Sequence, residues 1–106
     1  MNRIVPRVLL GALAAAASVG IASAQGTDVR YLAANCANCH GTDGRAAAGG
    51  GMPALAGLTA SYFVEQMNAF KNDKRQGTIM HQIAKGYTDA EITQMAAYFA
   101  AQKPSK

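Results

Sequence analysis

Two cysteines and a histidine lie within five residues of this chain, in the segment NCANCHGTDG. They are Cys36, Cys39 and His40, and the 106 residues contain no further cysteine. Two thiols at this spacing are typical of zinc sites, of dithiol redox pairs, and of cysteines that attach haem covalently. The rest of the sequence has to distinguish among these three kinds of chemistry.

Zinc and dithiol chemistry are the weaker interpretations. A structural zinc site needs four Cys or His ligands, and the chain offers Cys36, Cys39, His40 and His81. Three of these are adjacent and one is distant, whereas zinc ligands usually come as two spaced pairs. A dithiol redox pair normally follows a strand, and the residues before Cys36 contain no predicted strand.

Covalent haem attachment explains all three residues. Each thiol adds to one vinyl group of the porphyrin, the two intervening residues span the distance between the vinyls, and the next residue lies beneath the iron. The sequence therefore predicts haem c bound through Cys36 and Cys39 with His40 as an axial ligand. Its second imidazole nitrogen needs a hydrogen-bond acceptor, and we expect a backbone carbonyl from Pro53 or a neighbour in GMPALAGL.

The sixth iron ligand is expected to be a methionine, because a thioether favours the ferrous state and raises the reduction potential. Met80 is the favoured residue, in a short segment between Gly77 and Gly86 that can cross the opposite porphyrin face. Met52 and His81 remain alternatives. Two further methionines continue apolar helical stripes and are predicted to fill the core: Met67 and Met95.

Residues 1–24 have the pattern of a secretory signal peptide. Arg3 and Arg7 precede an apolar run over residues 8–19, and Ala22, Ser23 and Ala24 resemble a cleavage site. The apolar run is shorter than the roughly 20 residues that a membrane-spanning helix needs. We therefore expect export to the periplasm, with no stable membrane insertion after cleavage, and a single mature domain over residues 25–106.

Size and charge limit the partners of that domain. A chain this short usually needs a metal, a disulfide or another cross-link to be stable, which a covalent haem would supply. The full sequence carries a net charge of +4, and two of its basic residues lie in the predicted signal peptide. So small an excess does not favour nucleic acid as a partner. The basic residues of Lys71–Arg75 are expected to form a solvated loop.

The predicted fold class is all-α, with about four short helices. Thr27 is expected to cap a first helix that runs into the cysteine pair. A glycine-rich loop follows, and Thr59 caps a helix over about 61–71. Residues 77–86 allow at most two helical turns. Thr88 and Glu91 form a capping box for a last helix, and Tyr31, Tyr98 and Phe99 are expected to pack the first helix across the last.

The segment from Pro53 to Lys103, with its TIM, IAKGYTDAEI and MAAYF motifs, resembles class I c-type cytochromes. The similarity is to the cytochrome subunit of flavocytochrome c sulfide dehydrogenase and, more distantly, to one half of cytochrome c4. It implies a small helical cytochrome fold around one haem c, with His40 and Met80 axial and Pro53 near the histidine. It also implies an FAD-containing sulfide dehydrogenase flavoprotein as partner. His81 departs from the small residue that often follows the ligand methionine.

Electron transfer is therefore the predicted function, because outer-sphere transfer needs no acid, base or nucleophile and the sequence offers no catalytic constellation. The haem would accept electrons from a sulfide-oxidising flavoprotein, or act in a free carrier that exchanges electrons with another periplasmic redox protein. Two alternatives from other classes are a haem peroxidase or gas-binding protein with an open sixth position, and a zinc-binding module.

Overall fold

The computed structural model describes residue 11 and residues 28–105, so the predicted signal peptide lies outside the described residues. The described part is helical and contains no strand, as predicted. Its elements, in chain order, are α1 (Val29–His40), η1 (Thr42–Gly44), α2 (Ala60–Lys71), α3 (Met80–Ile83), η2 (Ala84–Gly86) and α4 (Asp89–Ala100). None of the helices in this part is long and apolar enough to cross a membrane.

Helix caps set most of these boundaries. The Thr59 hydroxyl accepts a hydrogen bond from the Tyr62 N–H, which confirms the predicted start of α2. The capping box of α4 is also confirmed, because the Thr88 side chain accepts from the Glu91 N–H and the Glu91 carboxylate from the Thr88 N–H. The predicted cap of α1 was wrong by one residue, since the carboxylate of Asp28 accepts the Arg30 N–H.

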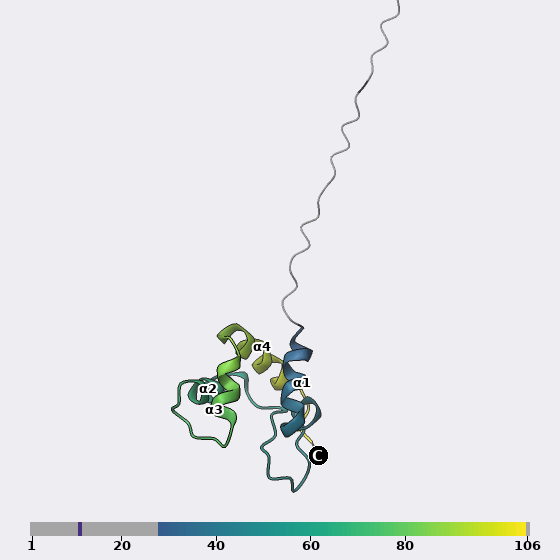
Figure 1. Ribbon diagram of the computed structural model, residues 1–106. Helices are drawn as coiled ribbons and strands as arrows, with labels where there is room; N and C mark the ends of the chain where they lie inside the picture. The colour runs from purple at the N-terminus through teal and green to yellow at the C-terminus, as the bar shows by residue number, and fades with distance from the viewer. Residues whose placement is uncertain (1–10, 12–27, 106) are drawn as a thin grey trace, which may run out of the picture.

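The C-terminal helix α4 joins the two sides of the molecule. It packs against α1 on one side and α2 on the other, and α3 packs on α2 (Figure 1). Ile92, Met95 and Phe99 on its inner face are fully buried, and the Phe99 and Phe63 rings lie 5.5 Å apart. The core therefore lies along α4 and leaves α1 and the α2–α3 pair as two facing walls.

The aromatic packing between α1 and α4 differs from the prediction at one residue. Phe99 is buried as expected, but Tyr31 is 73% exposed, so it does not pack the first helix onto the last. Tyr98 instead donates a hydrogen bond from its hydroxyl to Asp43 in η1, and this bond raises the pKa of Tyr98. Asp43 belongs to η1, a short 3-10 helix within the segment that was predicted to be a glycine-rich loop.

Gly44 holds the glycine-rich loop onto the core. Its carbonyl accepts hydrogen bonds from the N–H groups of Leu55 and Ala56, at 2.8 and 3.1 Å. Its φ is +77°, and a Cβ atom there would lie 2.8 Å from the Ala56 nitrogen and 2.9 Å from the Phe99 ring. Only glycine fits this position without strain, because both the positive φ and the close approach exclude a side chain.

Gly44→Ala is therefore expected to lower the free energy of unfolding by more than about 2 kcal/mol, since overpacking and left-handed strain each cost about 1–2 kcal/mol. Thermal denaturation followed by circular dichroism would measure the loss. Gly86→Ala is the matched control, because a Cβ at Gly86 meets no atom within 4 Å. Equal melting temperatures for the two variants would contradict this account of the loop.

Candidate haem site

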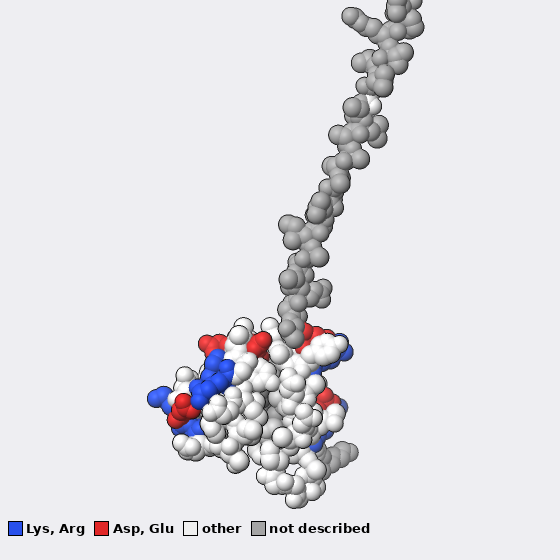
Figure 2. Space-filling view, viewed as in Figure 1, with Lys and Arg blue, Asp and Glu red and all other residues white. Residues whose placement is uncertain are grey.

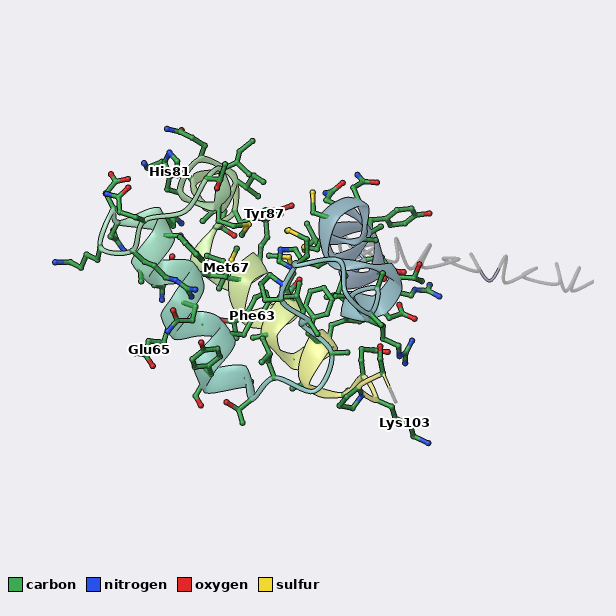
Figure 3. All side chains as sticks on the ribbon, turned by 90° about the horizontal axis from the view of Figure 1, so that it is seen from below. Phe63, Glu65, Met67, His81, Tyr87 and Lys103 are labelled. Atoms are coloured by element: carbon green, nitrogen blue, oxygen red, sulfur yellow. The ribbon has the colours of Figure 1, made fainter. Side chains whose placement is uncertain are left out.

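A cavity of about 470 Å³ lies between α1 and the α2–α3 pair. Its volume is within the range of about 300–1,000 Å³ that is usual for small-molecule and cofactor sites. Most of its lining is apolar, and Phe63, Met67 and Leu55 belong both to the lining and to the core packing. Figure 3 shows Phe63 and Met67 on the α2 side of this space. The cavity is therefore suited to a large, mostly apolar group.

Helix α1 brings the three residues of the cysteine motif to the cavity. Cys36, Cys39 and His40 all line it, because positions three and four residues apart share one face of a helix. Cys36 is half-buried and Cys39 is exposed, and both are free thiols. Burial raises the pKa of the Cys36 thiol, so this group is protonated at neutral pH until it reacts.

His40 is fixed by one hydrogen bond. Its side chain is buried, and Nδ1 lies 2.7 Å from the carbonyl oxygen of Pro53. A carbonyl only accepts, so Nδ1 donates its hydrogen and the neutral ring keeps its lone pair on Nε2. This is the tautomer in which imidazole binds a metal through Nε2, with the second nitrogen orienting the ring.

The loop around Gly44 supplies that carbonyl. Gly44 accepts hydrogen bonds from Leu55 and Ala56, which follow Pro53 by two and three residues. The same backbone contact therefore holds both the turn that follows α1 and the segment that contains the acceptor for His40.

Met80 lies on the wall opposite the cysteine motif. It is the first residue of α3, is half-buried, and lines the cavity. Met52 also lines the cavity but is 43% exposed, on the loop between η1 and α2. Met67 and Met95 are buried in the core, as predicted. Met67 also lines the cavity, from α2, so two methionines face α1 from the second wall, and Met80 is the one that is only half-buried.

His81 points away from the cavity. It lies on the outer side of α3 (Figure 3) and is absent from the lining of the cavity. Its charge contributes to lowering the pKa of Asp73, for which the hydrogen bond from Lys85 is the main cause. In the part of the chain that the structure describes, no three His, Cys, Asp or Glu side chains form a metal-binding group. The zinc interpretation needed Cys36, Cys39, His40 and His81 together, but His81 is not in the cavity lining that contains the other three.

The donors around the cavity fit haem c. Two thiols at the required spacing lie on one wall, an imidazole whose Nε2 has no protein partner among the described residues lies beside them, and a thioether lies on the facing wall. Between them the cavity presents the apolar surface that a porphyrin requires.

The family is decided by comparison with known sequences. The Cytochrome c family model matches residues 24–103. This chain belongs to the cytochrome c family. It is a class I c-type cytochrome, and a covalently attached haem c is the cofactor expected of it.

Several curated proteins are similar to this cytochrome. The thiosulfate dehydrogenase electron acceptor of Thiomonas intermedia is 35% identical over 99% of this chain and 46% of its own length. The cytochrome subunit of sulfide dehydrogenase from Chlorobaculum tepidum is 41% identical over 64% of this chain and 60% of its own length. The cytochrome thus spans less than two thirds of the length of these relatives.

Solved structures show the same fold. The cytochrome c4 of Acidithiobacillus ferrooxidans superposes with a TM-score of 0.58 and 42% identity, over 62% of this chain and 37% of the other. The thiosulfate dehydrogenase of Marichromatium purpuratum gives a TM-score of 0.66 and 30% identity, over 73% and 18% respectively.

Sequence reasoning missed the polar side chains of the second wall. Gln66 and Arg75 line the cavity together with Met80. Arg75 is exposed and lies in the loop after α2, as the predicted solvated basic loop requires. The only available signal was the position of Gln66 one turn before the buried Phe70, on a helix already predicted to border the core.

Proposed function

We propose that this cytochrome works in the periplasm and carries one electron at a time through a haem bound by Cys36 and Cys39, with His40 and Met80 as axial ligands. The observation that carries the proposal is the hydrogen bond from His40 Nδ1 to the Pro53 carbonyl. It leaves the lone pair of Nε2 available to bind iron, inside a cavity that Met80 also lines. The signal-like residues 1–24 support export.

Haem c supplies an iron centre that takes up and releases a single electron. The protein residues hold that centre and keep it closed to other ligands. His40 is oriented from behind by Pro53, and the buried side chains of Phe63 and Met67 give the cavity an apolar lining. Fixed ligands and an apolar lining suit outer-sphere transfer, because little has to move when the charge changes.

We further propose that the electrons come from a sulfide-oxidising, FAD-containing dehydrogenase. The support is the 41% identity with a protein named as the cytochrome subunit of sulfide dehydrogenase. A thiosulfate dehydrogenase is the second candidate, since the similarity to an acceptor of that name extends over 99% of the chain. Both partners would make the cytochrome a one-electron acceptor for the oxidation of a small inorganic sulfur compound.

Reduction kinetics distinguish the two partners. Stopped-flow reduction of the oxidised cytochrome would be followed by haem absorbance, with catalytic amounts of the flavoprotein and sulfide, or of thiosulfate dehydrogenase and thiosulfate. We expect reduction at least about tenfold faster with the flavoprotein, which corresponds to about 1.4 kcal/mol of barrier. Faster reduction by thiosulfate dehydrogenase would assign the second partner, and no reduction by either would contradict the proposal.

The surface suggests how that partner docks. Figure 2 shows charged side chains at the two sides of one face and uncharged side chains over the area between them. Ile79 and Ile83 belong to the cavity lining and are 56% and 38% exposed. Apolar contact at this rim would make the reduction rate only weakly dependent on salt, whereas a charge-steered encounter slows steeply as ionic strength rises.

A further inference from the structure

The last turn of α4 contacts the loop between α1 and α2 near both of its ends. The Tyr98 hydroxyl donates a 2.5 Å hydrogen bond to Oδ1 of Asp43. The carbonyl of the next residue in α4, Phe99, accepts a 2.9 Å hydrogen bond from the Gly57 N–H. The carbonyl of Pro53, which orients the imidazole of the site, lies between these two contacts. Two consecutive residues of one helix therefore hold both sides of the segment that carries this carbonyl.

A third contact comes from the residues that follow α4. Nε of Arg45 donates a 2.8 Å hydrogen bond to the carbonyl of Lys103, and Nη1 of the same guanidinium donates at 3.2 Å to Oδ2 of Asp43. Lys103 lies beyond the end of α4 (Figure 3). The carboxylate of Asp43 thus receives one hydrogen bond from α4 and one from a side chain that is itself attached to the C-terminal segment.

Asp43 has a backbone conformation that needs such support. Its φ is +54°, in the left-handed region that residues with a Cβ rarely adopt. A conformation of this kind persists only where the surrounding contacts hold it. The ring of Tyr98 is fixed in turn, because it packs edge-on against Phe99 with the ring centroids 5.3 Å apart. A strained residue is therefore held from a rigid support.

The position of Asp43 reaches the axial histidine through the backbone. Gly44, the next residue, accepts hydrogen bonds from the N–H groups of residues 55–56, and these directly follow the segment that contains Pro53. The Pro53 carbonyl oxygen lies 2.7 Å from His40 Nδ1. A hydrogen bond from the second nitrogen of a metal-binding imidazole raises the basicity of the ring. Small shifts of this loop therefore change how strongly Nε2 donates to a metal.

We propose that Tyr98 and Arg45 are positioning residues for the axial histidine. They hold Asp43, and through it the loop, where the Pro53 carbonyl accepts the hydrogen bond from Nδ1. This inference rests on the proposed role of His40 as an iron ligand. Without the Tyr98 hydroxyl the loop moves outward and the bond to Nδ1 weakens, so the less basic imidazole stabilises ferric iron less and the reduction potential rises. Loss of a partner at Asp43 has the opposite effect if it acts only through charge, because an unpaired carboxylate favours ferric iron.

The test compares the haem-loaded variants Y98F and Y31F. Each removes one tyrosine hydroxyl, but Tyr31 is 73% exposed and its ring does not pack between α1 and α4. The first readout is the chemical shift of the His40 Nδ1 proton in the reduced protein, measured by heteronuclear NMR. It reports the strength of the hydrogen bond, which a loss of global stability alone does not change. We expect this resonance to move upfield in Y98F and to stay in place in Y31F.

The second readout is the reduction potential from a potentiometric titration. We expect Y98F to shift the redox equilibrium about threefold toward the reduced form, which is about 28 mV for one electron at about 59 mV per tenfold change. We expect no such shift in Y31F. A potential that does not rise in Y98F would contradict the positioning role.

Arg45→Met covers the case in which Y98F fails to take up haem. It removes both hydrogen bonds of the guanidinium, and R30M is its control, because it removes an equal charge from a side chain that is 78% exposed. The Nδ1 proton should move upfield in R45M and not in R30M. An unmoved resonance in R45M or Y98F, or an equal move in a variant and its control, would overturn the inference. Wild-type His40 ring protons without the ring-current shift of a haem ligand would instead refute the proposed function.

Discussion

The double variant Cys36→Ser/Cys39→Ser is expected to lose its haem completely to acidified organic solvent, whereas the wild type should retain it on the polypeptide. Both thiols line the cavity from one face of α1, and a serine hydroxyl does not form the thioether link. The measurement is the distribution of haem absorbance between the solvent phase and the precipitated protein.

Single variants are the controls for this extraction. Cys36→Ser and Cys39→Ser each leave one thiol, so each should keep haem on the chain through one link. Cys36 is half-buried and Cys39 is exposed, so the two single variants need not retain equal amounts of haem. Retention of haem by the double variant would show that the link is made elsewhere, and the proposed site would then be wrong.

Met80→Ala is expected to open the sixth position of the iron. Met80 lies on α3, across the cavity from His40, and an alanine has no sulfur to offer. The oxidised protein should lose its weak absorption band near the red end of the spectrum, and the potential should fall because the thioether raises it. Carbon monoxide should bind the reduced variant more than about tenfold tighter than wild type, a difference above about 1.4 kcal/mol.

Two matched variants separate the alternatives to Met80. Met52→Ala removes an exposed thioether that also lines the cavity, and His81→Ala removes the imidazole on the outer side of α3. Both should keep the red band and exclude carbon monoxide. If Met52→Ala opens the iron and Met80→Ala does not, the axial assignment moves to Met52. A bis-histidine spectrum in wild type would instead indicate His81.

Loss of the covalent haem links should also destabilise the cytochrome. The described core consists of a few side chains along α4, with Phe99, Ile92 and Met95 as its fully buried members, and a large cavity beside it. Domains of this size usually depend on a cofactor or cross-link for stability. The double serine variant therefore offers a second readout, since its helical circular dichroism should melt at a lower temperature than that of wild type.

Local features of the sequence were sufficient for the kind of cofactor and for two of the helix caps. The spacing of Cys36, Cys39 and His40 is fixed by bonds along the chain, and the caps at Thr59 and Thr88 depend on residues three positions apart. Such features do not depend on how the rest of the chain packs, which is why they could be read directly. The start of α1 was misplaced because Thr27 and Asp28 are both good caps.

Contacts between distant segments were decided only by the tertiary structure. The sequence proposed the carbonyl of Pro53 or a neighbour, and the Gly44 contact with Leu55 and Ala56 is what brings the Pro53 carbonyl to His40. Tyr31 lies on α1 but its side chain is exposed, because the rotation of α1 relative to α4 is set by the whole interface between them. Arg75 lies in the predicted solvated loop, and its stacking on Phe70 also places it at the cavity.

The amino-acid sequence by itself therefore determined the kind of cofactor and the helical class, because the motif spacing and the helix caps act within a few residues. The tertiary structure decided which carbonyl orients His40, which way His81 points, and which charged side chain lines the cavity. Those outcomes depend on loop closure and on packing between elements that no local pattern records.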